Sequence, residues 1–374
     1  MQFKDVIGQQ SIKNYLLNSA QSDQVSHAQL FLGNEGSGNL ALAIAYAQYL
    51  QCRNRGEQDA CGTCRSCVKA NKLMHPDIHF SYPTVGSKAK STDFLTEWRT
   101  AVQEHPYMNV YQWLQDIKAE NKQGNITREE CEAIIRKLSL RAYESTYKVL
   151  IMWMPEYLGK EGNRLLKLIE EPPANTVFLL VAENANLILN TILSRTQQLR
   201  VYRLSDAEIS EALVNRHGVT ANAARQVAIL AEGDYNKALE LLSNSDNDNQ
   251  QLLIKWLGAC LSNQSGILLE WVEEIAKLGR ENQKNFIKYA LYFLRQSLLL
   301  QMEHSKTISL DNEELQFARQ LMEKMTLENF EAIIQLLDNA SYHIERNANP
   351  KILFLHVSIQ VMDSYRVLMN ESIQ

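Results

Sequence analysis

The sequence predicts an α/β chain in which a parallel-sheet domain is followed by a small and then a larger all-helical domain. In the first 204 residues, short and almost wholly apolar segments alternate with helical patterns. A glycine-rich turn joins the first apolar segment to a helical pattern, and after residue 205 the apolar spacing stays helical. Alternating strands and helices are typical of α/β domains, whose covered parallel strands are apolar along their length.

The composition supports a globular chain of two or three domains. It has 374 residues, with 45% hydrophobic and 22% charged residues, which excludes disordered and collagen-like proteins. No run of about 18 apolar residues occurs, and the first five residues lack a signal-peptide core, so we expect a cytoplasmic protein without a membrane partner. The net charge of −5 gives no overall basic field. Any contact with DNA must therefore come from a local patch or a larger assembly.

The first domain is expected to end near Leu204, after four strands and four helices in alternation. The predicted strands are 28–32, 148–153, 176–182 and 199–202. The predicted helices are 9–20, 40–50, 128–140 and 165–169, the last of which Pro172 and Pro173 terminate.

The helical parts begin at Ser205, which has capping-box spacing to Glu208. A small helical unit is expected at 205–245, and the polar run 243–250 is a linker candidate. From 250 to 374, apolar residues trace the faces of long helices and predict a third, all-α domain. These faces comprise Ile287, Ala290, Leu291, Leu294 and Leu298, and Phe330, Ile333, Ile334, Leu337, Ala340 and Ile344.

The glycine-rich turn, 33–40 (GNEGSGNL), has the spacing of a P-loop, G-x-x-x-x-G-K-[ST], between a strand and a helix. The candidate nucleotide-binding residues are Gly33, Gly36, Gly38 and Asn39. A P-loop Lys neutralises phosphates and the following hydroxyl binds magnesium, whereas Asn39 and Leu40 supply neither group. We therefore expect a degenerate P-loop whose backbone amides hold an anion at most weakly.

A second segment also lacks the chemistry of phosphoryl transfer. In a P-loop ATPase, an apolar strand ends in a carboxylate that reaches the magnesium ion. Here the strand 148–153 ends in Trp153 and is followed by Met154, Pro155 and Glu156. Two separate segments thus predict that this chain does not hydrolyse ATP.

Four cysteines within sixteen positions predict a zinc site, with four unrelated free thiols as the alternative. The candidate ligands are Cys52, Cys61, Cys64 and Cys67. Tetrahedral Zn²⁺ suits four thiolates, Gly62 allows a tight turn between ligands, and a site without an open position is structural. We interpret His75 and His79 as ordinary polar positions. Cys131 and Cys260 lie on apolar helical faces and are expected in the core.

Several ordered motifs together resemble those of the clamp-loader branch of the AAA+ proteins. Besides the four cysteines, the segments that carry the resemblance are 3–9 (FKDVIGQ), 27–33 (HAQLFLG), 75–77 (HPD), 168–173 (LIEEPP), 194–196 (SRT) and 347–350 (NANP). They cover most of the chain. The resemblance implies a P-loop AAA+ domain at 1–204 that carries a zinc module at 52–67 and an insertion at 81–124. It further implies a helical lid at 205–245 and a helical collar for oligomerisation at 250–374.

The departures from the family pattern imply a subunit that does not act as a motor. Motors keep the P-loop Lys and the acidic strand end, and they usually carry Arg where Asn236 stands here. The segment 194–196 matches the family's Ser-Arg-Cys motif, with Thr196 in place of Cys. By that match Arg195 is an arginine finger that acts in trans on ATP bound to a neighbouring motor subunit. By its position alone, Arg195 would be an ordinary surface arginine.

The implied function is non-catalytic participation in the loading of sliding clamps during bacterial DNA replication. The implied partners are motor subunits and a clamp-opening subunit in a hetero-oligomer, with the sliding clamp and primer–template DNA reached through the assembly. Zn²⁺ is the implied structural cofactor. The alternatives are an active motor ATPase and a stand-alone zinc-dependent DNA-binding module. The negative net charge disfavours the DNA-binding module.

The insertion 81–124 is longer than the family usually carries, and it is rich in aromatic residues. They are Phe94, Trp98, Tyr107, Tyr111 and Trp113. These rings could form a partner surface, because aromatic residues are enriched in interface hot spots. We favour the alternative that they pack on their own domain.

Overall fold

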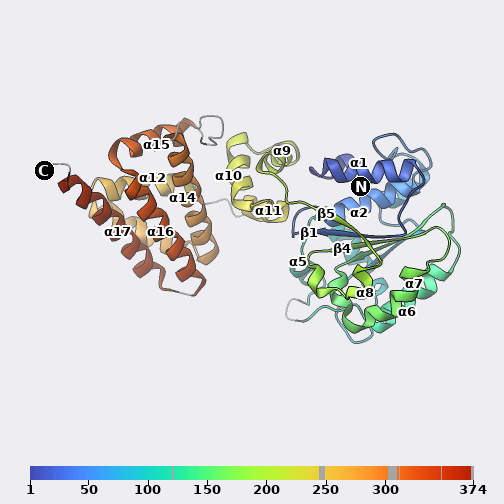
Figure 1. The fold of residues 1–374 in the computed structure, drawn as a ribbon. Coiled ribbons are helices and arrows are strands. Elements are labelled where there is room, and N and C mark those ends of the chain that lie inside the picture. Colours follow the sequence, from blue (N-terminus) through green and yellow to red (C-terminus); the bar gives the residue numbers. More distant parts are fainter. Residues whose placement is uncertain (120–121, 244–248, 302–309, 311, 347, 372–374) are drawn as a thin grey trace. The chain divides into compact units, whose positions relative to one another are not determined.

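The computed structural model describes residues 1–119, 122–243, 249–301, 310, 312–346 and 348–371. Contacts divide the chain into two compact units, Met1–Leu241 and Leu242–Gln374. The predicted combination of a parallel-sheet domain with helical parts is confirmed (Figure 1). Most of the predicted linker 243–250 and the first residue of the motif 347–350 lie outside the described residues.

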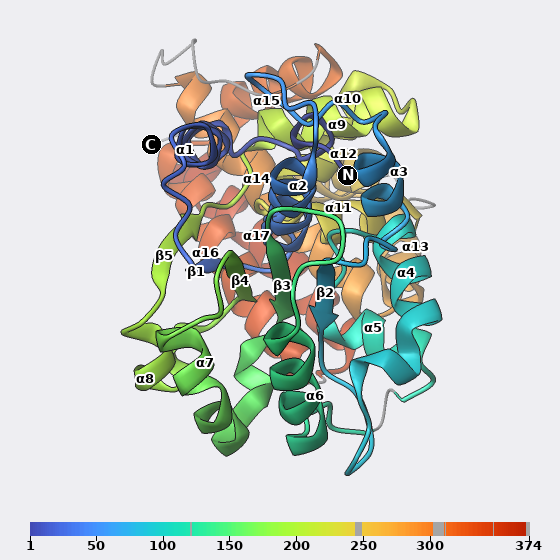
Figure 2. The same cartoon turned by 90° about the vertical axis from the view of Figure 1, so that its right-hand side faces the viewer.

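The first unit is built on a five-stranded parallel sheet with the strand order β2-β3-β4-β1-β5 (Figure 2). The strands are β1 (Ala28–Gly33), β2 (Ile78–Ser81), β3 (Lys148–Trp153), β4 (Thr176–Ala182) and β5 (Gln197–Val201). The four predicted strands are present. Strand β2 is absent from the prediction because it has only four residues, two of them polar, and so forms no apolar run.

Helices cover both faces of the sheet, which explains the apolar strands. Helices α1 (Gln10–Gln21) and α2 (Asn39–Gln51) lie on one face, and α2 is buried along its whole length. The other face packs against α6 (Arg128–Ser139), the 3₁₀ segment η3 (Pro155–Leu165), α7 (Leu166–Glu170) and α8 (Asn190–Leu193). The core on that side includes Cys131, as predicted. The remaining short elements are η1 (Phe3–Asp5), α3 (Arg65–Asn71) and η4 (Ala185–Leu187).

The insertion contributes η2 (Ser91–Phe94), α4 (Leu95–Glu104) and α5 (Val110–Asp116). Trp98 and Trp113 are fully buried and meet edge to face, with ring centroids 5.3 Å apart. Trp98 also lies 5.3 Å from the ring of Trp153 at the end of β3. Tyr107 is buried as well, whereas Tyr111 is exposed. For these three buried rings, the prediction that they pack on their own domain is confirmed.

Three helices follow the sheet within the first unit: α9 (Asp206–His217), α10 (Ala221–Ala231) and α11 (Tyr235–Ser243). The predicted capping box at the start of α9 is confirmed, because Ser205 Oγ accepts from the backbone of Glu208 and the Glu208 carboxylate accepts from the backbone of Ser205. Contact clustering groups residues 205–241 with the sheet. A domain boundary at residue 205 stays a prediction.

The second unit is all-helical. Its helices are α12 (Asn249–Leu261), α13 (Ser265–Lys277), α14 (Arg280–Gln301), α15 (Asn312–Lys324), α16 (Leu327–Glu345) and α17 (Pro350–Glu371). The rings of Trp256 and Trp271 stack at 5.4 Å in its core, beside Phe286 and Phe354. Cys260 is buried, as predicted. Among the described residues, none of the helices combines the length and apolar character needed to cross a bilayer.

Candidate functional site

The degenerate P-loop connects β1 to α2, as the sequence predicts. Gly38 precedes the first turn of α2 with φ of 88°, and Gly36 has φ of 67°. Both values lie in the left-handed region that glycine adopts without steric strain. The backbone path therefore requires these glycines, whether or not a phosphate is bound.

Asn39 points into the protein interior. Its side chain is buried, and Nδ2 donates to the carbonyl oxygens of Gly33 at 3.2 Å and Ala182 at 3.3 Å. The amide thus ties the loop to the end of β4. This is a structural use of the position at which a P-loop carries its Lys.

The two left-handed glycines are covered by other parts of the chain. A Cβ atom placed on Gly36 would lie 1.7 Å from Oδ1 of Asp234, and one placed on Gly38 would lie 2.8 Å from the ring of Tyr107. The backbone N–H of Tyr235 donates to the Gly36 carbonyl oxygen at 3.1 Å. Two segments distant in sequence therefore lie directly against the glycines of the loop.

Tyr107 is itself held firmly. Its hydroxyl accepts a hydrogen bond from the backbone N–H of Ile7 at 2.9 Å, and its ring packs edge to face on Tyr235 at 5.0 Å. The sequence analysis assigned no role at the loop to Tyr107 or Asp234. No local signal could reveal one, because 69 positions separate Gly38 from Tyr107.

Carboxylates gather beside the loop. Burial, together with the charges of Glu35, Glu156 and Asp234, raises the pKa of Glu183 to about 7. Glu156 accepts from the backbone N–H groups of Glu183 at 2.7 Å and Asn184 at 2.9 Å, which joins the ends of β3 and β4. Like charges near an anion are unfavourable, so this group opposes the binding of a triphosphate.

Glu183 should make stability depend on pH. Its folded pKa lies above the ordinary value of 4.5, so its ionisation destabilises the fold as pH rises from about 4.5 through 7. Arg200 and Arg203 line the same hollow as Glu183. We expect Glu183→Gln to stabilise the first unit by about 1–2 kcal/mol at pH 8, after allowance for partial exposure, and much less at pH 5.

Thermal unfolding of Glu183→Gln and of the unsubstituted chain at pH 5 and pH 8 checks this expectation. Glu211→Gln, on the exposed side of α9, is the matched control, and it should change stability little at either pH. An equal effect of Glu183→Gln at both pH values would contradict the assignment of the raised pKa.

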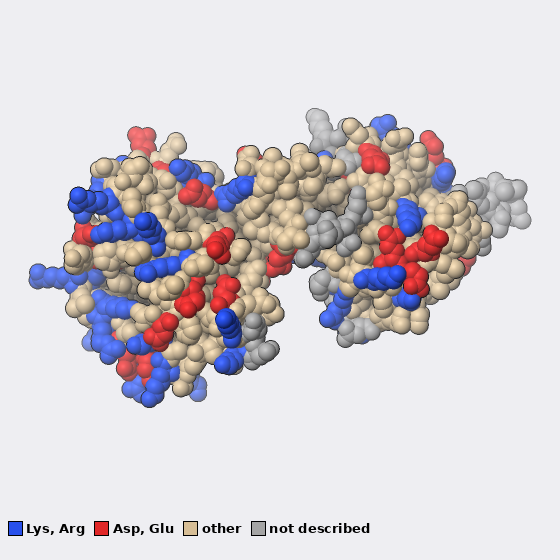
Figure 3. Space-filling model, turned by 180° about the vertical axis from the view of Figure 1, so that it is seen from behind, with Lys and Arg blue, Asp and Glu red and all other residues tan. Residues whose placement is uncertain are grey.

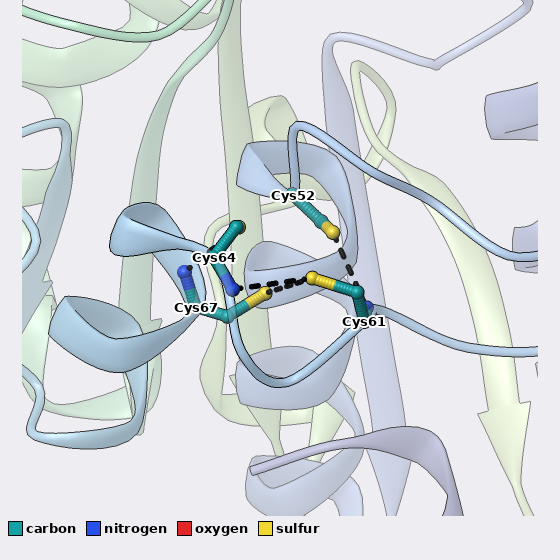
Figure 4. A group of neighbouring side chains, drawn as sticks. All are labelled: Cys52, Cys61, Cys64 and Cys67. Carbon is teal, nitrogen blue, oxygen red and sulfur yellow. Dashed lines mark hydrogen bonds between the residues drawn. The ribbon is translucent and has the colours of Figure 1, made fainter.

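The four predicted zinc ligands lie together between the end of α2 and the start of α3 (Figure 4). Their sulfur atoms all lie within 4.8 Å of one another, and the Sγ atoms of Cys61 and Cys67 are 3.9 Å apart. Tetrahedral bonds of about 2.3 Å place sulfurs about 3.8 Å apart, so the four cysteines are close enough to bind one metal ion. They form the one cluster of metal-ligand type among the described residues.

Backbone N–H groups surround the sulfurs. Cys52 Sγ accepts from the N–H of Cys61 at 3.3 Å, and Cys61 Sγ accepts from the N–H of Cys64 at 3.3 Å. The bonds to Cys61 hold its pKa at about 6, which favours the thiolate. Gly62 has φ of 73°, so the predicted tight turn between ligands is confirmed. The donor set and its hydrogen bonds fit Zn²⁺.

His75 and Asp77 connect the zinc module to the sheet. His75 is buried, and its Nε2 lies 3.3 Å from the hydroxyls of Ser66 and Ser145. The Asp77 carboxylate accepts from the backbone N–H groups of Tyr143 at 2.5 Å, Glu144 at 2.9 Å and Ser145 at 3.0 Å. The segment 75–77 therefore fixes the loop that precedes β3.

Arg195 follows α8 and is about one-third exposed. Its Nε donates to the Glu170 carboxylate at 3.0 Å, and Nη1 donates to the carbonyl oxygen of Thr191 at 3.0 Å. Glu170 belongs to the segment 168–173, so the fold brings two of the motifs from the sequence together. These contacts hold the guanidinium at the surface in a defined direction.

Arg195 lies at the opposite end of β5 from the P-loop. It precedes β5, whose first residue, Gln197, pairs with Gln29, whereas the loop begins at Gly33, which pairs with Val201. Four residues of strand span about 13 Å. Arg195 is therefore separated from the loop of its own chain by about the length of this strand.

Comparisons with known proteins give consistent results. A family model described as DNA polymerase III, delta subunit, matches residues 8–205. The relatives include DNA polymerase III subunit delta' of Bacillus subtilis, 27% identical over 64% of this chain, and subunit tau of the same organism, 23% identical over 94% of this chain. The alignments span 60% of the length of each relative. A solved Bacillus subtilis DNA clamp loader delta protein aligns over 94% of this chain and 99% of its own, with 11% identity and a TM-score of 0.32.

Proposed function

The chain belongs to the DNA polymerase III delta-subunit family, whose model matches residues 8–205, and from this premise we propose that it is a non-catalytic clamp-loader subunit of the delta-prime type. In this proposal its partners are ATP-hydrolysing gamma/tau subunits and a clamp-opening delta subunit. The sliding clamp and primer–template DNA are reached through the assembly. Residues 1–204 act as the AAA+ domain, 205–245 as its lid and 250–374 as the collar.

The observation that carries the proposal is the covered P-loop. Asp234 and Tyr107 lie against Gly36 and Gly38, and Asn39 bonds to the protein interior. A motor subunit needs open space, a Lys and a magnesium ligand at these places. The active-motor alternative would therefore require the lid and the insertion to move away from the loop.

Arg195 supports a role in trans. Its surface position, beyond reach of its own P-loop, suits a guanidinium that completes the ATP site of an adjacent motor subunit. There its fixed charge would stabilise the phosphates in the transition state. Glu170 would hold the side chain until that neighbour docks.

Zinc bound by Cys52, Cys61, Cys64 and Cys67 would act structurally. With four sulfur ligands the metal has no open position and supplies folding free energy to the module. The module in turn holds the start of the chain, because the Asp59 carboxylate accepts from the backbone N–H groups of Phe3 and Lys4 at 3.0 Å each.

We expect the isolated chain not to hydrolyse ATP, and Asn39→Lys not to create that activity. The new Lys would meet a loop that Asp234 and Tyr107 already cover. Loss of the buried Asn39 hydrogen bonds should destabilise the first unit by about 1–3 kcal/mol. Phosphate release at saturating ATP and thermal unfolding measure the two effects.

The appropriate reference is an active gamma/tau subunit, together with its own variant that lacks the P-loop Lys. Hydrolysis by the isolated chain above the rate of that inactive variant would contradict the proposal and favour a motor. Asn39→Ala separates the loss of hydrogen bonds from the effect of the introduced charge, since it should destabilise the unit to a similar extent.

A further inference from the structure

The zinc module and the loop before β3 form one surface, which the proposed function does not use. Lys69 on α3 pairs with Glu144 of that loop, with 2.6 Å between Nζ and Oε2. The Gln51 amide donates to the Tyr147 carbonyl oxygen at 2.8 Å, and His75 lies against Ser145. Residues 52–72 and 140–147 are thus packed side by side, and we call their joint outer face the zinc-module surface.

This surface contains a polar pocket of about 450 Å³. Arg53 and Arg55 line it together with Ser145 and Thr146, and its lining also includes Glu144, Cys52, Leu50 and Gln51. Each arginine is anchored by one backbone carbonyl, Arg53 by Glu144 at 3.4 Å and Arg55 by Leu50 at 2.5 Å. A guanidinium has five N–H donors, so both arginines retain donors for an anion. Two arginines and two hydroxyls are groups that bind a phosphate.

Basic side chains outnumber acidic ones around the pocket. Residues 52–72 contain five Lys or Arg and two Asp or Glu, whereas the net charge of the chain is −5. Arg65, Lys69 and Lys72 recur at i, i+4 and i+7 and so share one side of α3. Figure 3 shows Lys and Arg side chains gathered along one flank of the first unit, the left-hand part of that view.

Other donors bind most of the acidic groups and sulfurs nearby. The Asp59 carboxylate accepts from backbone N–H groups, and Glu144 Oε2 pairs with Lys69, whereas Glu144 Oε1 accepts no hydrogen bond. The sulfurs of Cys52, Cys61 and Cys64 accept from the backbone N–H groups of Cys61, Cys64 and Cys67. The guanidinium groups of Arg53 and Arg55 bond to backbone carbonyls.

An exposed aromatic ring stands at the same surface. Tyr143 is 81% exposed and Leu140 is 67% exposed, and Arg141 between them is exposed as well. The loop that carries them is fixed by the Asp77 carboxylate and by buried Lys148, whose Nζ donates to the Leu140 carbonyl oxygen at 2.6 Å. A rigid loop that presents a free aromatic ring next to arginines has the features of a stacking platform for an unpaired base.

We propose that the zinc-module surface binds single-stranded nucleic acid. A backbone phosphate enters the pocket between Arg53 and Arg55, and an adjacent unpaired base stacks on Tyr143. The basic side of α3 contacts further phosphates of the same nucleic acid. In a duplex the bases are stacked on one another, so Tyr143 favours a single strand over a double strand.

The test measures fluorescence anisotropy of a labelled 20-nucleotide single strand with the zinc-loaded full chain at several salt concentrations. We expect Arg53→Gln with Arg55→Gln to weaken binding about tenfold at low salt and to reduce the slope of log Kd against log salt by about 0.7, the value for one phosphate contact on a single strand. Tyr143→Ala should weaken single-strand binding, and Tyr143→Trp should restore it.

The matched control is Arg128→Gln with Arg203→Gln. It removes the same charge outside the pocket, at the start of α6 and after β5. This control should bind as the unsubstituted chain does. Zinc content and thermal stability verify that every variant is folded.

Competition separates the possible sources of the anion. If inorganic phosphate, at an equal concentration of phosphate groups, displaces the labelled single-stranded nucleic acid, the pocket binds free phosphate. That result would overturn the proposal that it binds single-stranded nucleic acid. Displacement by polyglutamate of equal charge would overturn it in favour of an acidic polypeptide. Unchanged affinity of the Arg53 and Arg55 variant, or equal affinity for a duplex, would also contradict it.

Discussion

Arg195→Ala should abolish most of the ATP hydrolysis at the neighbouring motor site in a reconstituted clamp loader. An arginine finger supplied in trans contributes a factor of roughly 10³ to 10⁵ in rate in other phosphoryl-transfer systems. The total ATP turnover of the complex should fall by at least the fraction that this one site contributes. The measurement is ATP turnover stimulated by clamp and primed DNA, with assembly checked by the mass of the complex.

Three further variants make this experiment specific. Arg195→Lys keeps the charge but loses the planar donors, so it should recover only part of the rate. Arg164→Ala removes another exposed arginine that also pairs with a glutamate, Glu161, and should leave turnover unchanged. Glu170→Gln removes the partner that holds Arg195 and should reduce turnover far less than loss of Arg195 does. Full turnover with Arg195→Ala in an intact complex would refute the finger assignment.

Replacement of Cys64 and Cys67 by Ser should remove the zinc ion and strongly destabilise the first unit. A structural zinc ion supplies folding free energy to a segment with little core of its own. We expect a loss of about 4 kcal/mol or more, the range typical of a lost metal or a broken buried network. Metal analysis should give one zinc per unsubstituted chain and none per variant, and unfolding should report the stability.

The other two cysteines provide the control. Replacement of Cys131 and Cys260 by Ala should leave one zinc per chain, because both lie in apolar cores away from the metal cluster. A strong chelator should destabilise the unsubstituted chain as the double Ser variant does, and added Zn²⁺ should reverse that effect. A metal-free preparation with full stability would refute a structural zinc site.

Much of the first unit could be predicted because its signals are local. The apolar segments at β1, β3 and β4 are continuous because helices cover both faces of the sheet. The capping box at Ser205 and the turn at Gly62 each lie within a few residues. By contrast β2 escaped prediction, since four residues that include His79 and Ser81 carry no apolar run.

The sequence by itself determined that the residues for phosphoryl transfer are missing and that a metal site is possible. Asn39 and Leu40 exclude a P-loop Lys and its hydroxyl, and the spacing of four cysteines predicts a metal site. These conclusions depend only on which residue types stand a few positions apart in the sequence. That spacing is the same whatever fold the chain adopts.

Only the tertiary structure decided what surrounds those residues. It placed Tyr107 and Asp234 against the glycines, put Arg195 at the other end of β5 from its own loop, and packed Arg53 and Arg55 against the loop of Tyr143. The physical reason is that strand order and helix packing set such neighbours. Residues 69 to nearly 200 positions apart then meet through contacts that no local pattern records.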